Sequence, residues 1–206
     1  MEISSELIKD LRQRTGAGVM DCKTALRESK GDMEGAIDYL RRKGLAAAAK
    51  RAGRIATEGL VSSYIHAGGK IGVLVEINCE TDFVGRTEDF QAFVKNMAMQ
   101  IAATSPQYVS RDQVPPSVVE REKGIYRTQA QDAKKPEKVL EKIIEGKLER
   151  FFAEVCLLEQ TYIKDPDVTV KEVLDSLIAK LGENIAIRRF SRFQLGEGLA
   201  SKPAEA

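Results

Sequence analysis

The side chains best suited to nucleophilic catalysis are few and far apart. The chain has one histidine, His66, and three cysteines, of which Cys79 is the closest to it in the sequence. A nucleophile and its base must lie within hydrogen-bonding reach. The residues between them predict a β-hairpin that turns at Gly68 and Gly69, which leaves Cys79 about eight residues beyond the position opposite His66. At roughly 3.3 Å per residue the two side chains are about 26 Å apart. We therefore predict no catalytic residue and no covalent chemistry.

The spacing of the His, Cys and Gly residues in the sequence also argues against a metal site and a nucleotide-binding site. One histidine and three scattered cysteines do not form the closely spaced ligand pairs of a structural zinc site. Gly16-x-Gly18 and Gly196-x-Gly198 each lack the third glycine of a dinucleotide fingerprint, and the sequence contains no P-loop motif. We predict no bound metal and no cofactor, so the pattern favours a binding protein over an enzyme.

Composition sets the broad class of the protein. The 206 residues are 43% hydrophobic and 31% charged, which fits one large globular domain or two small ones. The net charge of +1 gives no overall field for nucleic acid, and no apolar run approaches the roughly 20 residues that cross a membrane. The first residues show no secretory signal, and Cys22, Cys79 and Cys156 look like reduced, buried thiols. We expect a cytoplasmic protein.

The first fifty residues predict a bundle of three short helices. Apolar residues recur at helical spacing in three segments, separated by residues 15–18 and by Gly31 followed by Asp32. Residues 41–54 contain six basic side chains and no acidic ones, which predicts a basic helical linker. We place the bundle and this linker in residues 1–54.

The segment that follows predicts a second, α+β domain. Residues 60–66 and 71–79 alternate in the manner of strands around a Gly-Gly turn, so a hairpin is expected. Alternate residues of the second strand, from Ile71 to Cys79, share one face. A helical stripe offers a partner for that face, and its members are Phe90, Phe93, Val94, Met97 and Ile101.

The rest of the chain predicts helices and a closing strand. Residues 115–155 read as a helical hairpin that is split near residues 133–136. A capping box at Thr169 and Glu172 opens a helix that Gly182 closes, and residues 184–194 read as a strand that completes a small antiparallel sheet. We assign residues 55–198 to this core and residues 199–206 to a flexible tail.

One loop presents an aromatic side chain beside a carboxylate. Residues 76–84 (EINCETDFV) run from a strand into a loop that carries Asp82 and Phe83. A phenylalanine in a loop usually fills a core, but this chain already offers a core from its hairpin and helix stripe. Phe83 is therefore interpreted as an apolar wedge for a partner protein.

These residues carry a resemblance to a known family. Residues 76–84, together with residues 11–26 (LRQRTGAGVMDCKTAL), resemble the two signatures of elongation factor Ts. The likeness continues through residues 59–66, 180–189 and 193–198, so it covers nearly the whole chain.

The resemblance implies a guanine-nucleotide exchange factor for the GTPase elongation factor Tu, in its GDP-bound and nucleotide-free forms. It implies that the N-terminal bundle is similar to ubiquitin-associated domains and docks on the nucleotide domain of the GTPase. The element expected to dislodge Mg²⁺ from the GTPase is Thr81, Asp82, Phe83 and Val84. The further contacts implied are Arg12, Met20, Lys23, His66, Leu181 and Gly182. Core packing is the alternative for Met20, and an exposed strand end is the alternative for His66.

The chain also departs from the longer members of that family. They carry two related core subdomains, whereas this sequence has one hairpin and one Thr-Asp-Phe-Val element. It resembles the short form, which implies a homodimer through the core sheets, with a monomer as the alternative. Phe83 and His66 then act on one partner molecule or from different subunits, and the number of GTPase molecules bound stays open. Any role of Cys79 or Cys156 at the dimer interface stays open too.

Two other classes of function compete with exchange. A nucleic-acid-binding protein is suggested by residues 41–54 and by the arginines and phenylalanines of residues 188–193, although the neutral net charge opposes it. An adaptor of the ubiquitin-associated type would use only the bundle, so deleting residues 1–50 would abolish its binding. An enzyme remains as a residual third class.

Overall fold

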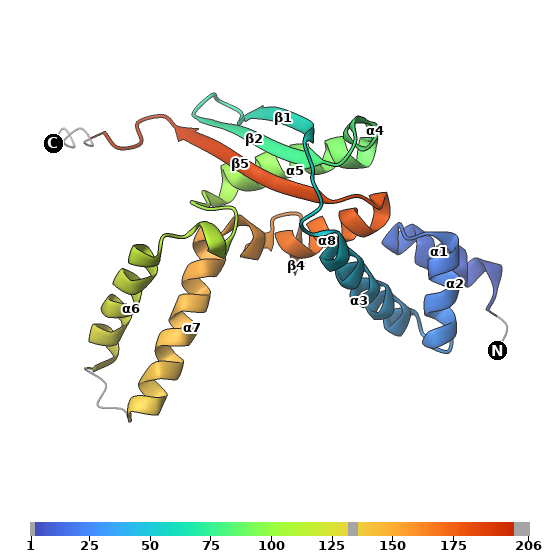
Figure 1. Ribbon diagram of the computed structural model, residues 1–206, viewed down its shortest axis with the longest axis horizontal. Coiled ribbons are helices and arrows are strands. Elements are labelled where there is room, and N and C mark those ends of the chain that lie inside the picture. Colours follow the sequence, from blue (N-terminus) through green and yellow to red (C-terminus); the bar gives the residue numbers. More distant parts are fainter. Residues whose placement is uncertain (1–2, 132–135, 200–206) are drawn as a thin grey trace. The chain divides into compact units, whose positions relative to one another are not determined.

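A computed structural model describes residues 3–131 and 136–199 (Figure 1). The chain divides into two compact units, and each of them is discontinuous in sequence. The first comprises Met1–Gly59, Asn78–Gln91 and Lys171–Ala186, and the second comprises Leu60–Ile77, Ala92–Val170 and Ile187–Ala206.

Three helices begin the first unit, as the sequence predicted. They are α1 (Ser5–Thr15), α2 (Val19–Glu28) and α3 (Met33–Arg51). The side chains of Ser4 and Asp32 cap α1 and α3 by accepting hydrogen bonds from the backbone, at 3.2 and 2.8 Å. Gly16 ends α1 in the left-handed conformation, with φ 66°.

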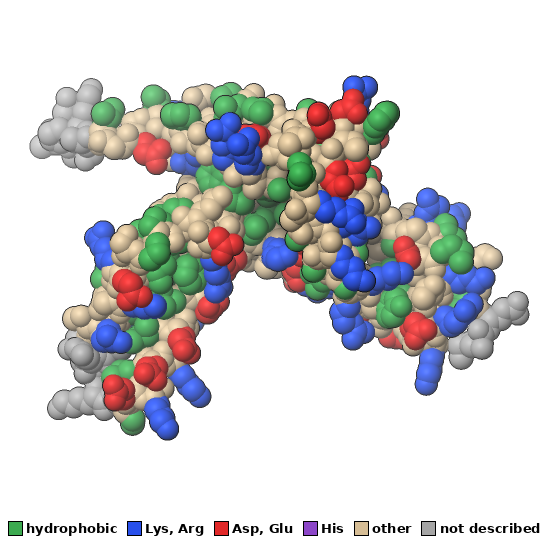
Figure 2. Space-filling view, viewed as in Figure 1, with side chains coloured by type: hydrophobic (Ala, Val, Ile, Leu, Met, Phe, Trp, Pro, Cys, Tyr) green, Lys and Arg blue, Asp and Glu red, His purple; other side chains and the backbone are tan. Residues whose placement is uncertain are grey.

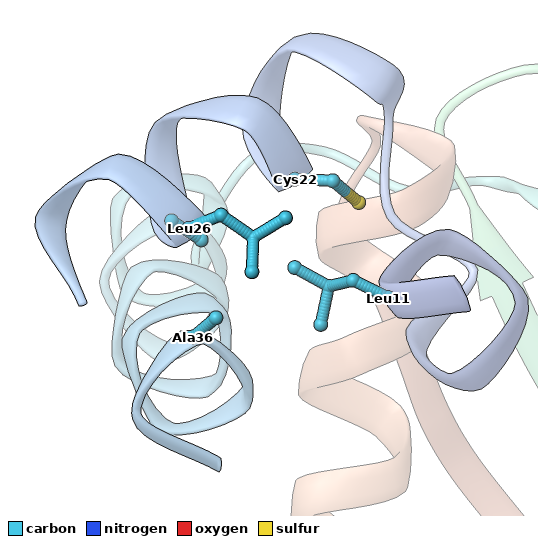
Figure 3. Packing of buried hydrophobic residues seen from close by; sticks show 5 residues of the cluster. Leu11, Cys22, Leu26 and Ala36 are labelled. Carbon is cyan, nitrogen blue, oxygen red and sulfur yellow. The ribbon is translucent and has the colours of Figure 1, made fainter. Parts of the chain in front are cut away.

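The core of the bundle is small and combines two leucines with shorter side chains (Figure 3). Its fully buried members are Leu11, Cys22, Ala25, Leu26 and Ala36. The predicted helical character of the basic segment 41–54 is confirmed as far as Arg51, because α3 continues through it without a break. The likeness of this bundle to ubiquitin-associated domains stays a prediction.

An antiparallel sheet has the strand order β1-β2-β5, and most of its residues belong to the second unit (Figure 1). Its strands are β1 (Glu58–Ile65), β2 (Ile71–Cys79) and β5 (Ile185–Gln194). The predicted hairpin is confirmed, since His66 N donates to Ile71 O at 2.9 Å and both turn glycines have positive φ. The predicted closing strand is confirmed as well, because β5 pairs beside β2.

The predicted apolar faces of β2 and the following helix are both buried. Val73, Val75, Ile77 and Cys79 alternate as buried residues along β2. Helix α5 (Glu88–Thr104) buries every member of its predicted stripe. Arg192 Nε in β5 donates to Ala102 O in α5 at 3.3 Å, which places this helix against the sheet.

The predicted helical hairpin is formed by α6 (Pro116–Gln131) and α7 (Glu137–Val155). The split expected near residues 133–136 falls mostly on residues 132–135, which lie outside the described residues. The short helix η1 (Arg111–Gln113) lies near the C-terminal half of α7. Its Arg111 pairs with Glu149 and Glu159 and lies 4.5 Å above the Phe152 ring.

The segment after the hairpin contains two short strands that the sequence analysis missed. A 3₁₀ turn η2 (Leu157–Glu159) leads to β3 (Thr161–Tyr162), which pairs antiparallel with β4 (Asp165–Thr169). Helix α8 (Val170–Leu181) begins directly after Thr169 and ends at Gly182, as predicted. Residues 200–206 of the predicted tail lie outside the described residues. The fold class is α+β, as expected.

Candidate functional site

The Thr-Asp-Phe-Val element lies where β2 leaves the sheet. Thr81 precedes α4 (Asp82–Gly85), a helix of one turn. Phe83 is 78% exposed, whereas Val84, the next residue, is buried. The turn therefore inserts one apolar side chain into the core and holds the other in solvent, and Phe83 is not a core residue.

Two local interactions hold this turn. Arg86 Nη2 lies 2.6 Å from Asp82 Oδ2, four residues apart on the same helical face. Cys79 Sγ donates to Thr81 O at 3.1 Å, and burial raises the pKa of that thiol. Asp82 is thus paired with a cation of its own chain.

Leu181 and Gly182, predicted from a distant part of the sequence, lie beside this turn. Glu183 accepts hydrogen bonds from Thr81 N at 3.0 Å and from Thr81 Oγ1 at 2.6 Å. Gly182 ends α8 with φ 78°, and its N–H donates to Ile178 O at 2.9 Å. The structure thus brings residues 81–84 and 181–182 together through Glu183, a residue that sequence reasoning missed.

A second carboxylate completes the connection between these segments. Glu80 Oε1 accepts a hydrogen bond from Asn184 N at 2.6 Å and lies 3.6 Å from Arg54 Nη1. Asn184 Nδ2 donates to Arg54 O at 2.7 Å. Arg51 Nε donates to Gly182 O at 2.9 Å. The end of α3 is therefore part of the same hydrogen-bonded network.

The predicted contacts on the bundle are all exposed. Met20 is 71% exposed, so it does not pack in the core of the bundle, and Lys23 lies three residues further along α2 on the same side. Arg12 is exposed on α1. Lys43 Nζ in α3 lies 2.7 Å from Asp21 Oδ1 in α2, and this hydrogen bond raises the pKa of Lys43.

His66 lies at the end of the β1–β2 hairpin, in the second compact unit. Its ring is exposed, and Nδ1 lies 3.0 Å from Tyr64 Oη. Residues 81–84 belong to the first unit, so the structure places His66 and Phe83 in separate units.

Several of the basic residues that suggested nucleic acid are paired with carboxylates. Arg188 Nη1 and Arg189 Nε each lie 2.6 Å from the Glu76 carboxylate, and their hydrogen bonds hold the pKa of Glu76 below its usual value. Arg41 pairs with Glu172 in the same way. Figure 2 shows both signs of charge mixed along α6 and α7. Arg41, Arg188 and Arg189 are therefore each engaged by a carboxylate of their own chain.

All three cysteines are buried and free. Burial raises the pKa of each thiol, to about 11 for Cys156. Within residues 3–131 and 136–199 there is no cluster of three or more His, Cys, Asp or Glu suited to hold a metal ion. None of the helices in that part of the chain is both long and apolar enough to cross a membrane.

Comparisons with known proteins agree on one family. The family model described as elongation factor TS matches residues 47–197. Elongation factor Ts of Carboxydothermus hydrogenoformans is 64% identical over 200 residues, covering 97% of this chain and 92% of that protein. Elongation factor Ts of Geobacter sulfurreducens is 61% identical over 205 residues, covering 100% and 95%. That of Thermoanaerobacter sp. is 60% identical over 203 residues, covering 98% and 100%.

Proposed function

The chain belongs to the elongation factor Ts family, and from this premise we propose that it is a guanine-nucleotide exchange factor for elongation factor Tu. It binds the GTPase in its GDP-bound form, promotes release of GDP and stays on the nucleotide-free form until GTP enters. The observation that supports this proposal best is the exposed Phe83 on a turn that the rest of the unit holds in place.

The proposed mechanism acts through the Mg²⁺ ion of the GTPase. Mg²⁺ demands near-ideal octahedral geometry and bridges protein groups to phosphate, so a small displacement of the surrounding elements weakens GDP binding. Phe83 supplies the wedge and Asp82 its polar neighbour. Exchange is then a linkage effect, in which GDP and this protein lower each other's affinity by the same factor.

The burial of Phe83 limits the acceleration that this residue can supply, and a larger acceleration needs further contacts. Burying one phenylalanine contributes about 1.5–3 kcal/mol, or roughly ten- to a hundred-and-fifty-fold in affinity. The further contacts that we propose are Arg12, Met20, Lys23, His66, Leu181 and Gly182. In this account residues 1–54 dock on the nucleotide domain, and residues 55–198 carry the exchange element and a dimerisation sheet.

The sheet also supports a homodimer. Val61, Ile65 and Leu74 are large apolar residues of β1 and β2 that are 64%, 66% and 50% exposed. Apolar side chains exposed on neighbouring strands are typical of a surface that a partner covers. We propose that two copies pair through this sheet.

Stopped-flow release of a fluorescent GDP analogue from elongation factor Tu tests the proposal. The wild-type chain is expected to accelerate release, and Phe83→Ala to lose most of the acceleration at saturating concentration while still binding. An unchanged release rate with saturating wild-type protein would show that the chain is not an exchange factor. A binding signal that falls steeply with salt on a nucleic acid would then favour the nucleic-acid class.

A further inference from the structure

The side chain of Glu183 has an unusual concentration of donors around it. One oxygen accepts from two consecutive backbone amides, Glu80 N at 3.1 Å and Thr81 N at 3.0 Å. The other oxygen accepts from Thr81 Oγ1 at 2.6 Å. Hydrogen bonds to an ionised carboxylate are roughly twice as strong as those between neutral groups. The Glu183 carboxylate accepts three such bonds from Glu80 and Thr81, the two residues that lead into the Asp82–Phe83 turn.

These bonds replace the stabilisation that such a turn usually has. Thr81 is the N-cap residue of α4, and a threonine at that position normally accepts a hydrogen bond from the first turn of its own helix. Here its side chain makes no such bond, because the hydroxyl donates to Glu183 instead. A helix of one turn is not stable by itself, so the orientation of Phe83 depends on contacts from outside the turn.

The hydrogen bonds between residues 80–81 and residues 183–184 run in both directions. Glu183 binds the backbone of Glu80, and the Glu80 carboxylate binds the backbone N–H of Asn184 at 2.6 Å. Arg54 lies beside Glu80, and its carbonyl oxygen accepts from Asn184 Nδ2. Each segment thus holds the backbone of the other, which ties residues 80–81 to residues 183–184 as one body.

We propose that Glu183 is a positioning residue of the exchange site. Its carboxylate fixes the turn that presents Phe83 and holds that turn in register with Leu181 and Gly182, so that both segments meet the GTPase together. This inference rests on the proposed function. Glu183 itself does not need to contact the partner, and its removal affects how well Phe83 is presented rather than whether the proteins associate.

The first test separates presentation from association. Full-length wild type, Glu183→Ala and Glu183→Gln are titrated against elongation factor Tu loaded with a fluorescent GDP analogue. We expect Glu183→Ala to lower the maximal release rate by about tenfold or more, because all three charge-assisted bonds are lost, with little change in the half-saturating concentration. Glu183→Gln keeps one acceptor for the two amides and can donate to Thr81 Oγ1, so it should recover part of the rate. Glu145→Ala, which removes an exposed glutamate of α7 far along the chain from the proposed contacts, is the matched control.

The second test needs no partner. The chain contains no tryptophan, so Phe83→Trp introduces a unique reporter at the exposed position. Time-resolved anisotropy of Trp fluorescence is compared between Phe83→Trp alone and Phe83→Trp with Glu183→Ala or Glu183→Gln. The fast phase of the anisotropy decay should have a larger amplitude in the variant with Glu183→Ala than in the variant with Glu183→Gln. Far-UV circular dichroism shows whether each variant is folded. If Glu183→Ala does not fold, the double variant that combines Glu183→Gln with Thr81→Ala replaces it in both the release-rate and the anisotropy measurements.

The two tests distinguish failure of the inference from failure of the proposed function. Unchanged anisotropy and an unchanged maximal release rate in Glu183→Ala would overturn the positioning role. A rise in half-saturating concentration alone would also overturn it, since that result assigns Glu183 to association. If wild type does not accelerate release at all, the exchange function fails, and the anisotropy still decides whether Glu183 holds the turn.

Discussion

Replacing Leu26 by alanine should strongly destabilise the N-terminal bundle while leaving the sheet intact. Leu26 is fully buried, and of the five fully buried members of the bundle core only Leu11 and Leu26 are large aliphatic side chains (Figure 3). A buried Leu→Ala change costs about 2–5 kcal/mol through lost burial and the cavity left behind. A small core supplies only about 3–5 kcal/mol in total. The substitution therefore removes most of the local stability of the bundle.

Native-state hydrogen exchange of the backbone amides in α2 measures this loss. Protection of these amides should fall by at least about thirtyfold in Leu26→Ala, because each 1.4 kcal/mol is a factor of ten. Amides of β2 should keep most of their protection. Met20→Ala on the same helix is the matched control, since its exposed side chain should change protection by less than about threefold. A loss below tenfold in Leu26→Ala would refute the reasoning that this cluster is the core of the bundle.

Further predictions concern the helix end beside the site and the buried thiols. Gly182→Ala should lower the free energy of unfolding by about 1 kcal/mol, measured by urea titration, because φ 78° strains any residue with a Cβ although no atom lies within 4 Å of it. The Cys156 thiol, with its pKa raised by burial from 9.0 to about 11, keeps its proton when the unfolded chain has lost it. Stability should therefore be unaffected below pH 9 and fall by roughly 2–3 kcal/mol between pH 9 and pH 11, and Cys156→Ala should lessen that fall. Native protein at pH 7 should also react slowly with a thiol reagent, and three rapidly reacting thiols in native protein would contradict the burial.

The elements with a long apolar pattern were predictable from the sequence. The stripe from Phe90 to Ile101 has a clear helical period and forms α5, and the alternation from Ile71 to Cys79 forms β2. The exposed position of Phe83 could be inferred because other residues already supplied a core.

Elements that depend on contacts between distant residues were not predictable. Glu183 follows a helix-ending glycine, where an acidic residue is ordinarily solvated, and its partner Thr81 lies 102 positions away. Residues 41–54 were assigned to a helical linker because they carry six basic and no acidic residues, and this composition did not reveal that they extend α3 or that Arg41 and Arg51 find partners near α8. Strands β3 and β4 are too short to show a period.

The Mg²⁺ dependence of GDP release tests the central claim most directly. Maximal release rates from elongation factor Tu are measured for wild type and Phe83→Ala, first with excess Mg²⁺ and then with the ion removed by a chelator. If Phe83 acts by displacing Mg²⁺, wild type should be faster than the variant by roughly ten- to a hundred-and-fifty-fold with Mg²⁺, and the two rates should converge without it. An advantage of wild type that is equally large in the absence of Mg²⁺ would contradict the account.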